Sequence, residues 1–66
     1  MLTPDQLNIM ENSPVHWNLG AAKGLVVKVY GKGDGAKNGD FGLLIQPNDG
    51  SQLEFKKASE VDVDKP

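Results

Sequence analysis

Hydrophobic residues occur in five short runs after Pro14, and each run ends at a polar or glycine-rich break. Along the chain, the runs are VHWN at 15–18, GLVVKVY at 24–30, FGLLIQ at 41–46, QLEFK at 52–56 and VDV at 61–63. Short β-branched and aromatic runs separated by turn residues are typical of the strands of a small all-β domain. The pattern therefore predicts five strands.

Alternation within the runs predicts which side chains share a face. Val15 and Trp17 fall on one face of the first strand, and Leu53 and Phe55 fall on one face of the fourth. We expect Phe55 to lie in the core. The second strand is apolar on both faces, and a bulge near Gly24 would switch its register, so the sequence leaves open which of its valines point inward.

The breaks between the runs predict how the strands connect. The Asp49-Gly50 pair in PNDGS predicts a tight hairpin between the third and fourth strands. The segment KKASEVDV predicts a single helical turn at 58–60 ahead of the last strand. With a long connection between the second and third strands, this is the plan of an SH3-like barrel, whose closure leaves no exposed sheet edge.

The N-terminal segment carries a helix-start signal. Thr3 is suited to cap a helix, a proline follows at the first helical position, and Gln6 completes a capping box. The signal predicts one or two helical turns over residues 4–11, with Leu7 and Met10 on a shared face. We therefore divide the chain into a helical segment and a barrel, over residues 1–14 and 15–64.

The size and composition of the chain narrow the function classes. Its 66 residues suffice for one small domain and contain no cysteine and one histidine, which leaves no ligand set for a zinc site within one chain. Seven lysines, no arginine and a net charge of -2 disfavour strong binding of nucleic acid. Weak binding through a stripe of lysines stays open, and this stripe comprises Lys23, Lys28, Lys56 and Lys57. No apolar run could span a bilayer, so we expect a cytoplasmic protein without a membrane partner.

The stretch YGKGDGAKNGDFG, from Tyr30 to Gly42, resembles a phosphate-binding loop only in its glycine content. The spacing G-x-x-x-x-G-K-[ST] is absent, and a strand rather than a helix follows. The acidic and amide residues of the loop do not have the spacing of a calcium-binding loop. We interpret Gly31 to Gly39 as a hairpin connection whose glycines permit positive φ, and the loop contributes Lys32 and Lys37 as candidate contacts.

The other candidates for a binding site are the lone histidine and three aromatic residues: His16, Trp17, Tyr30 and Phe41. Pairing of the second and third strands would bring Tyr30 close to Phe41 at the root of the long loop. Such an aromatic rim suits a cation or an extended peptide. His16 should face away from its two neighbours in the strand, toward solvent or the N-terminal segment. No nucleophilic triad and no spaced acid pair is present, so we expect no catalytic residues, no cofactor and no enzyme activity.

Two segments, VHWNLGAAKGLVVKVYGKG and GLLIQPNDGSQLEFKKASEVDV, resemble the hypervirulence-associated Tudor-like domain family of small bacterial SH3-like barrels. The shared features are a V-x-W-N first strand, a glycine-started second strand, an apolar third strand ending at a D-G turn, and a Ser-Glu-Val step into the last strand. The resemblance covers Val15 to Val63 and implies a Tudor-like barrel. The family's usual stretch before the third strand is replaced here by GAKNGDFG.

GAAKGLVVKVY is also similar to the second strand of plasmid-borne, trimethoprim-insensitive dihydrofolate reductases. Their active-site strand is replaced by SQLEFK, so the residues that would bind folate and nicotinamide are missing. Our leading hypothesis is a non-enzymatic, Tudor-like module that binds a protein or peptide. A weak, KOW-like nucleic-acid-binding module and a reductase-like oligomer are the alternatives, and the sequence leaves the oligomeric state open.

Overall fold

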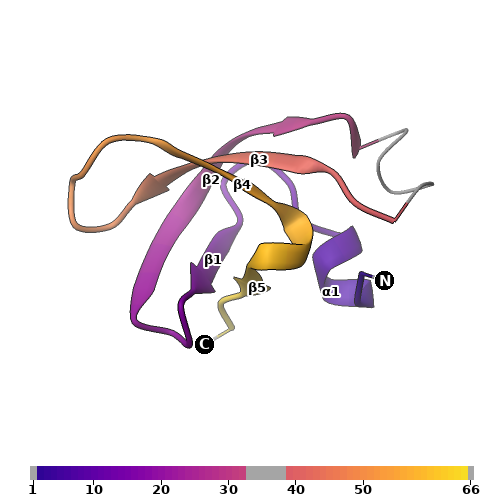
Figure 1. Ribbon diagram of the computed structural model, residues 1–66, viewed down its shortest axis with the longest axis horizontal. Coiled ribbons are helices and arrows are strands. Elements are labelled where there is room, and N and C mark those ends of the chain that lie inside the picture. Colours follow the sequence, from indigo (N-terminus) through magenta and orange to yellow (C-terminus); the bar gives the residue numbers. More distant parts are fainter. Residues whose placement is uncertain (1, 33–38, 66) are drawn as a thin grey trace.

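The computed structural model describes residues 2–32 and 39–65 (Figure 1). Its elements are α1 (Pro4–Leu7), β1 (Pro14–Trp17), β2 (Ala22–Tyr30), β3 (Gly42–Pro47), β4 (Glu54–Lys57), the 3-10 turn η1 (Ala58–Glu60) and β5 (Asp62–Val63). The five strands form one antiparallel sheet in the order β4-β3-β2-β1-β5, which confirms the five predicted strands. β4 and β5 are the two edges and do not pair with each other, so the sheet is open.

The described residues contain no helix with the length and apolar character needed to cross a membrane. Most of the predicted glycine-rich connection, residues 33–38, lies outside the described residues.

β2 is the longest strand and changes register partway along its length. The shift in its pairing with β3 falls between Val26 and Lys28, somewhat farther along the strand than the bulge near Gly24 that the sequence left open. Val26 is buried, Val27 is exposed and Val29 is partly buried. The bulge therefore decides which of the valines reach the core, and a strict alternation of side chains would have placed them incorrectly.

The predicted turns are confirmed. The connection between β3 and β4 contains Gly50 with a φ of 82°, a left-handed conformation that glycine adopts without steric cost. The helical turn before β5 is η1, in which the backbone N–H of Val61 donates to the carbonyl oxygen of Ala58 at 3.3 Å. The Glu60 carboxylate accepts a hydrogen bond from the backbone N–H of Lys57 at 2.8 Å, which closes the turn.

The core lies between the inner face of the sheet and the two helical turns. Figure 1 shows α1 and η1 side by side on this inner face of the sheet. The buried apolar residues come from every part of the described chain: Leu2, Ile9, Val15, Trp17, Val26, Phe41, Leu43, Ile45, Ala58 and Val61. The predicted shared face of Val15 and Trp17 is confirmed, since both are buried.

The N-terminal segment has the predicted capping box but a shorter helix. The Thr3 side chain accepts a hydrogen bond from the backbone N–H of Gln6, and the Gln6 side chain accepts one from the backbone N–H of Thr3. The helix ends at Leu7 after a single turn. The predicted helical face of Leu7 and Met10 is wrong, because Met10 lies beyond the end of the helix. Both side chains are exposed, and the buried residue of this segment is Ile9.

The prediction that Phe55 lies in the core is also wrong. β4 pairs with β3 so that Lys56 lies opposite Leu43 and Glu54 lies opposite Ile45, and both of these β3 residues are fully buried. Residues directly opposite each other on neighbouring strands share a face. Phe55 therefore lies on the outer face of the sheet, where 60% of its surface is exposed.

Candidate binding surface on the outer face of the sheet

The structure distributes the predicted site residues over several parts of the molecule. Trp17 and Phe41 are buried on the inner face, whereas Tyr30 is exposed on the outer face. His16 lies on β1, opposite Asp62 of β5. Lys37 lies outside the described residues. The predicted residues therefore do not form one site.

Tyr30 and Phe41 are close along the backbone but point to opposite faces of the sheet. Tyr30 pairs with Gly42, and Phe41 precedes Gly42 in the chain and belongs to the core. Lys32 places its Nζ 5.7 Å from the centroid of the Phe41 ring and donates a hydrogen bond to the carbonyl oxygen of Ile9 at 2.8 Å. Lys32 and Phe41 therefore join the N-terminal segment to the sheet, and the predicted aromatic rim is not formed.

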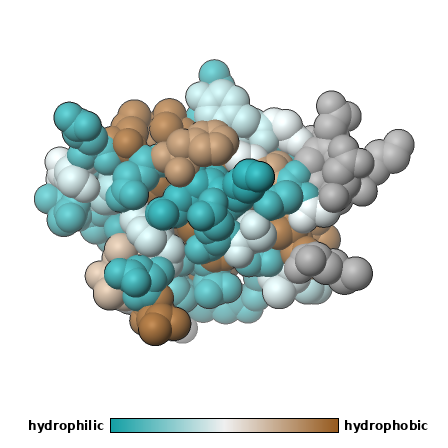
Figure 2. All heavy atoms as spheres, in the orientation of Figure 1, coloured by the Kyte–Doolittle hydropathy of each residue, from teal (hydrophilic) through white to brown (hydrophobic). Residues whose placement is uncertain are grey.

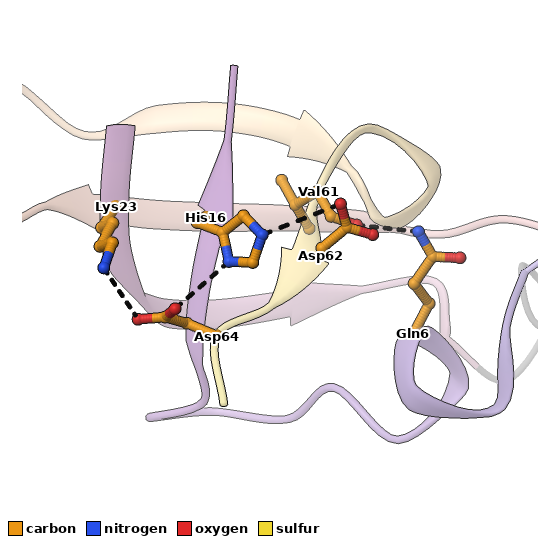
Figure 3. A network of polar contacts seen from close by, with 6 residues as sticks. All are labelled: Gln6, His16, Lys23, Val61, Asp62 and Asp64. Atoms are coloured by element: carbon orange, nitrogen blue, oxygen red, sulfur yellow. Dashed lines mark hydrogen bonds and ion pairs between the residues drawn. The ribbon is translucent and has the colours of Figure 1, made fainter. Parts of the chain in front are cut away.

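His16 faces away from Val15 and Trp17, as predicted, but it meets β5 and not the N-terminal segment. Its Nδ1 lies 3.3 Å from Asp64 Oδ1, and its Nε2 lies 3.9 Å from Asp62 Oδ2 (Figure 3). Lys23 Nζ lies 3.9 Å from the other oxygen of Asp64. Within residues 2–32 and 39–65, no cluster of histidine, aspartate and glutamate could hold a metal ion. The two-residue strand β5 is joined to β1 by backbone pairing, and these side chains lie beside it.

Trp17 lines a hollow of about 300 Å³ on the inner side of the sheet. Lys23, Pro47 and Glu54 also line it. Lys56 places its Nζ 5.6 Å from the centroid of the Trp17 ring. The Lys56 ammonium group therefore lies where a ligand cation would have to lie to contact the Trp17 ring. We interpret this contact as packing at the end of the core.

The outer face carries an aromatic pair that the sequence did not predict. The ring centroids of Tyr30 and Phe55 lie 6.1 Å apart at an interplanar angle of 46°. Lys28 Nζ lies 5.5 Å from the centroid of the Tyr30 ring. Tyr30 is 43% exposed, so both rings of the pair present much of their surface to solvent.

Six residues form two neighbouring rows across β2, β3 and β4: Lys28, Leu44 and Phe55 in one row, and Tyr30, Gly42 and Lys57 in the next. We call these six residues the outer patch. A Cβ on Gly42 would overlap the Phe55 ring, so the absence of a side chain allows the ring to lie over β3. Phe55 can thus reach Tyr30 on the far strand. Gly42 is the sequence signal for this pair, because a glycine within a strand often marks the close approach of another group.

Further exposed apolar side chains flank the outer patch: Leu25, Val27 and Leu53. In Figure 2, apolar atoms gather along the upper part of the molecule, over the strands β2, β3 and β4 of Figure 1. Single exposed apolar side chains are common, but a contiguous apolar area marks an interaction site. The outer patch therefore has the character of a binding surface.

The charged side chains at the outward positions of β2, β3 and β4 all have one sign. The outward positions of β2, β3 and β4 include Lys28 and Lys57 and no carboxylate, since Glu54 lies on the inner side. Elsewhere, the Asp49 carboxylate accepts a hydrogen bond from the backbone N–H of Ser51 at 2.9 Å. Asp5 Oδ2 lies 2.7 Å from Lys65 Nζ. A chain with a net charge of -2 thus has a locally basic face.

Asp40 joins the start of β3 to η1. Burial is the largest single influence on its carboxyl group and acts to raise its pKa. The hydrogen bonds from Ser59 Oγ at 2.8 Å and from the backbone N–H groups of Phe41 and Ser59, with the attraction of Lys57, together outweigh burial and hold the pKa of Asp40 below 3.8. Asp40 therefore contributes to the fold, because its hydrogen bonds join the start of β3 to η1.

Comparisons of the chain with models of protein families, with curated proteins and with solved structures found no match.

Proposed function

We propose that this protein is a non-enzymatic binding module that engages a protein or peptide through the outer patch. One observation carries the proposal: Tyr30 and Phe55 form an aromatic pair on the solvent side of the sheet, with Leu44 between their strands. Aromatic side chains are enriched at protein interfaces, where their large apolar area contributes much of the binding free energy. A small domain with ten buried apolar side chains among its described residues, yet with this aromatic pair exposed, is suited to binding.

The proposal includes a finer assignment of the fold. The strand order β4-β3-β2-β1-β5, the tight turn after β3 and the 3-10 turn before β5 support an SH3-like, Tudor-like plan. Barrels of this kind bind partners on the outside of a short, curved sheet, because side chains fill the interior. The resemblance of Val15 to Val63 to the hypervirulence-associated Tudor-like domains supports the same assignment.

The lysine positions favour a peptide over nucleic acid. The four lysines of the predicted stripe do not form one surface. Lys28 and Lys57 lie in the outer patch, and Lys56 lies over Trp17 on the inner face. Lys23 lies at the far end of the outer face, opposite His16, with its Nζ 3.9 Å from Asp64. Nucleic-acid affinity grows with the number of phosphates that are neutralised, and two lysines neutralise few.

Selection from a peptide library tests the proposal. We expect selection on the wild-type protein to enrich related peptides that no longer bind after Tyr30→Ser and Phe55→Ser are combined. Leu19→Ser is the matched control, because Leu19 is a fully exposed apolar residue in the β1–β2 turn, away from the outer patch. Peptides that bind the double variant as well as the wild type, or a selection that enriches none, would refute the proposal.

A further inference from the structure

We infer that the outer patch takes an acidic peptide segment in extended form, with one apolar side chain placed between two carboxylates. This inference rests on the proposed function and adds the chemistry of the partner. It follows from the positions of the two lysines relative to the aromatic pair.

The outer patch has its two cations at opposite corners. Lys28 lies on β2 in the row of Leu44, and Lys57 lies on β4 in the row of Gly42. Neighbouring strands are about 4.8 Å apart and residues two apart in a strand are about 6.8 Å apart, which separates the two lysines by about 12 Å at their Cα atoms. The aromatic pair occupies the other two corners, so the apolar centre of the outer patch lies between the cations.

An extended peptide matches this arrangement. Its side chains point to the same side every second residue, so carboxylates four positions apart are separated by about 13 Å. The residue midway between them points to the same side and would meet Tyr30 and Phe55. The lysine side chains are long and flexible enough to adjust to the small difference in spacing.

The charges of the outer patch favour an acidic partner. In the described part of the chain, neither Lys28 nor Lys57 lies within 4.0 Å of a carboxylate, although Asp40 attracts Lys57 from a greater distance. Each lysine is thus able to form an ion pair with a carboxylate of a partner. A second copy docked through the outer patch would bring like charges together, because the six residues of the patch include two lysines and no carboxylate. The net charge of -2 opposes the approach of a polyanion such as nucleic acid, whereas a short segment with two carboxylates encounters mainly the local lysines.

NMR titration of the full chain with synthetic peptides tests the inference. The probe is a nine-residue peptide with glutamates at its third and seventh positions, leucine at its fifth and serine elsewhere. A second peptide has glutamines in place of the glutamates, and a single-stranded oligonucleotide is titrated separately. We expect the acidic peptide to shift the amide signals of Tyr30, Leu44 and Phe55 and to bind more tightly than the glutamine peptide.

Charge reversal separates the role of the lysines from that of the aromatic pair. Lys28→Glu and Lys57→Glu should each weaken binding of the acidic peptide about threefold or more, since an exposed ion pair contributes little and its reversal adds repulsion. Lys65→Glu is the matched control, because it makes the same change of charge outside the outer patch. Lys65 lies near the C-terminus, where it is paired with Asp5.

The results distinguish failure of the acidic-peptide inference from failure of the proposed binding function. Equal binding of the glutamine peptide at the same amides would overturn the acidic preference and leave the binding module intact. Tighter binding of the oligonucleotide at the outer patch would overturn the acidic-peptide inference in favour of nucleic acid. No shift at these amides with either peptide would refute the inference, and the library selection would then decide the proposed function independently.

Discussion

Gln6 donates a hydrogen bond from its Nε2 to the carbonyl oxygen of Val61 at 2.8 Å, across 55 positions of sequence (Figure 3). The Oε1 of the same side chain accepts a hydrogen bond from the backbone N–H of Thr3 at 2.9 Å. Gln6 is 7% exposed and is the one buried polar residue among the described residues. One side chain therefore completes the helix cap and fastens α1 to the residue that precedes β5.

Replacement of Gln6 by alanine should destabilise the whole domain. The change leaves the buried carbonyl of Val61 without a donor, which costs about 1–3 kcal/mol of unfolding free energy. Urea unfolding followed by tryptophan fluorescence measures this cost. Gln52→Ala is the control, because Gln52 is exposed, and it should change the unfolding free energy by less than about 0.5 kcal/mol. Equal effects of the two changes would contradict this role of Gln6.

Gly42→Ala should separate Tyr30 from Phe55 at a small cost in stability. The new Cβ overlaps the end of the Phe55 ring, which is exposed and free to turn away. We expect the NOE contacts between the two rings to disappear and the unfolding free energy to fall by about 1 kcal/mol, the size of an aromatic pair interaction.

Gly24→Ala is the contrasting variant. A Cβ there would lie 2.5 Å from the backbone oxygen of Gln46, and a backbone atom cannot move aside without disturbing the pairing of β2 with β3. We expect this change to lower the unfolding free energy by about 2 kcal/mol or more, as overpacking does in a tight interior. A larger cost for Gly42→Ala than for Gly24→Ala in urea unfolding would contradict this explanation.

Leu19→Gly should stabilise the protein. Asn18 and Leu19 both have positive φ, at 57° and 58°, and the N–H of Gly20 donates to the carbonyl oxygen of Trp17 at 3.1 Å, as in a type I′ turn. This turn favours the sequence Asn-Gly, because a left-handed conformation costs a residue with a Cβ about 1 kcal/mol.

Thermal unfolding followed by circular dichroism measures this effect. We expect the unfolding midpoint of Leu19→Gly to rise by about 4 °C or more, because in a small domain a change of about 1 kcal/mol in unfolding free energy shifts the midpoint by about that much. Leu19→Ala keeps the Cβ and should leave the midpoint nearly unchanged. An equal rise for both variants would mean that removal of an exposed apolar side chain, and not relief of the turn, is the cause.

Asp40 should make the stability of the protein depend on pH. Its folded pKa lies below its ordinary value of 3.8, so the carboxylate contributes its full stabilisation above about pH 4 and loses it as the pH falls through the folded pKa. Asp40→Asn should therefore destabilise the protein at pH 6 and have a progressively smaller effect at lower pH.

Carboxyl NMR titration checks the cause of this dependence. Ser59→Ala removes the Oγ donor to Asp40 and should raise the pKa of Asp40 toward its ordinary value. A pKa that does not respond to Ser59→Ala, or an effect of Asp40→Asn that stays constant with pH, would contradict the role assigned to these hydrogen bonds.

Interactions between near neighbours in the chain were predictable from the sequence. The capping box of Thr3 and Gln6, the turn at Gly50 and the 3-10 turn at Ala58–Glu60 each depend on hydrogen bonds or φ values within a few residues. The five strands were also predictable, because short apolar runs between turn residues have few alternatives in a chain of this length. The length of α1 was not, since packing of Ile9 and not helical periodicity determines where the segment turns.

The candidate site was poorly predicted because it depends on which face of each strand meets the core. Alternation correctly grouped Leu53 with Phe55, but only the pairing of Lys56 with Leu43 decides that this group points outward. Likewise, the bulge after Val26 determines the faces of the later β2 residues. The amino-acid sequence was therefore sufficient for the local elements of this protein, because they depend on contacts between residues close in the chain. Which side chains form the candidate binding face depends on the three-dimensional structure, because side-chain orientation in a sheet follows from the register between strands that are distant in sequence.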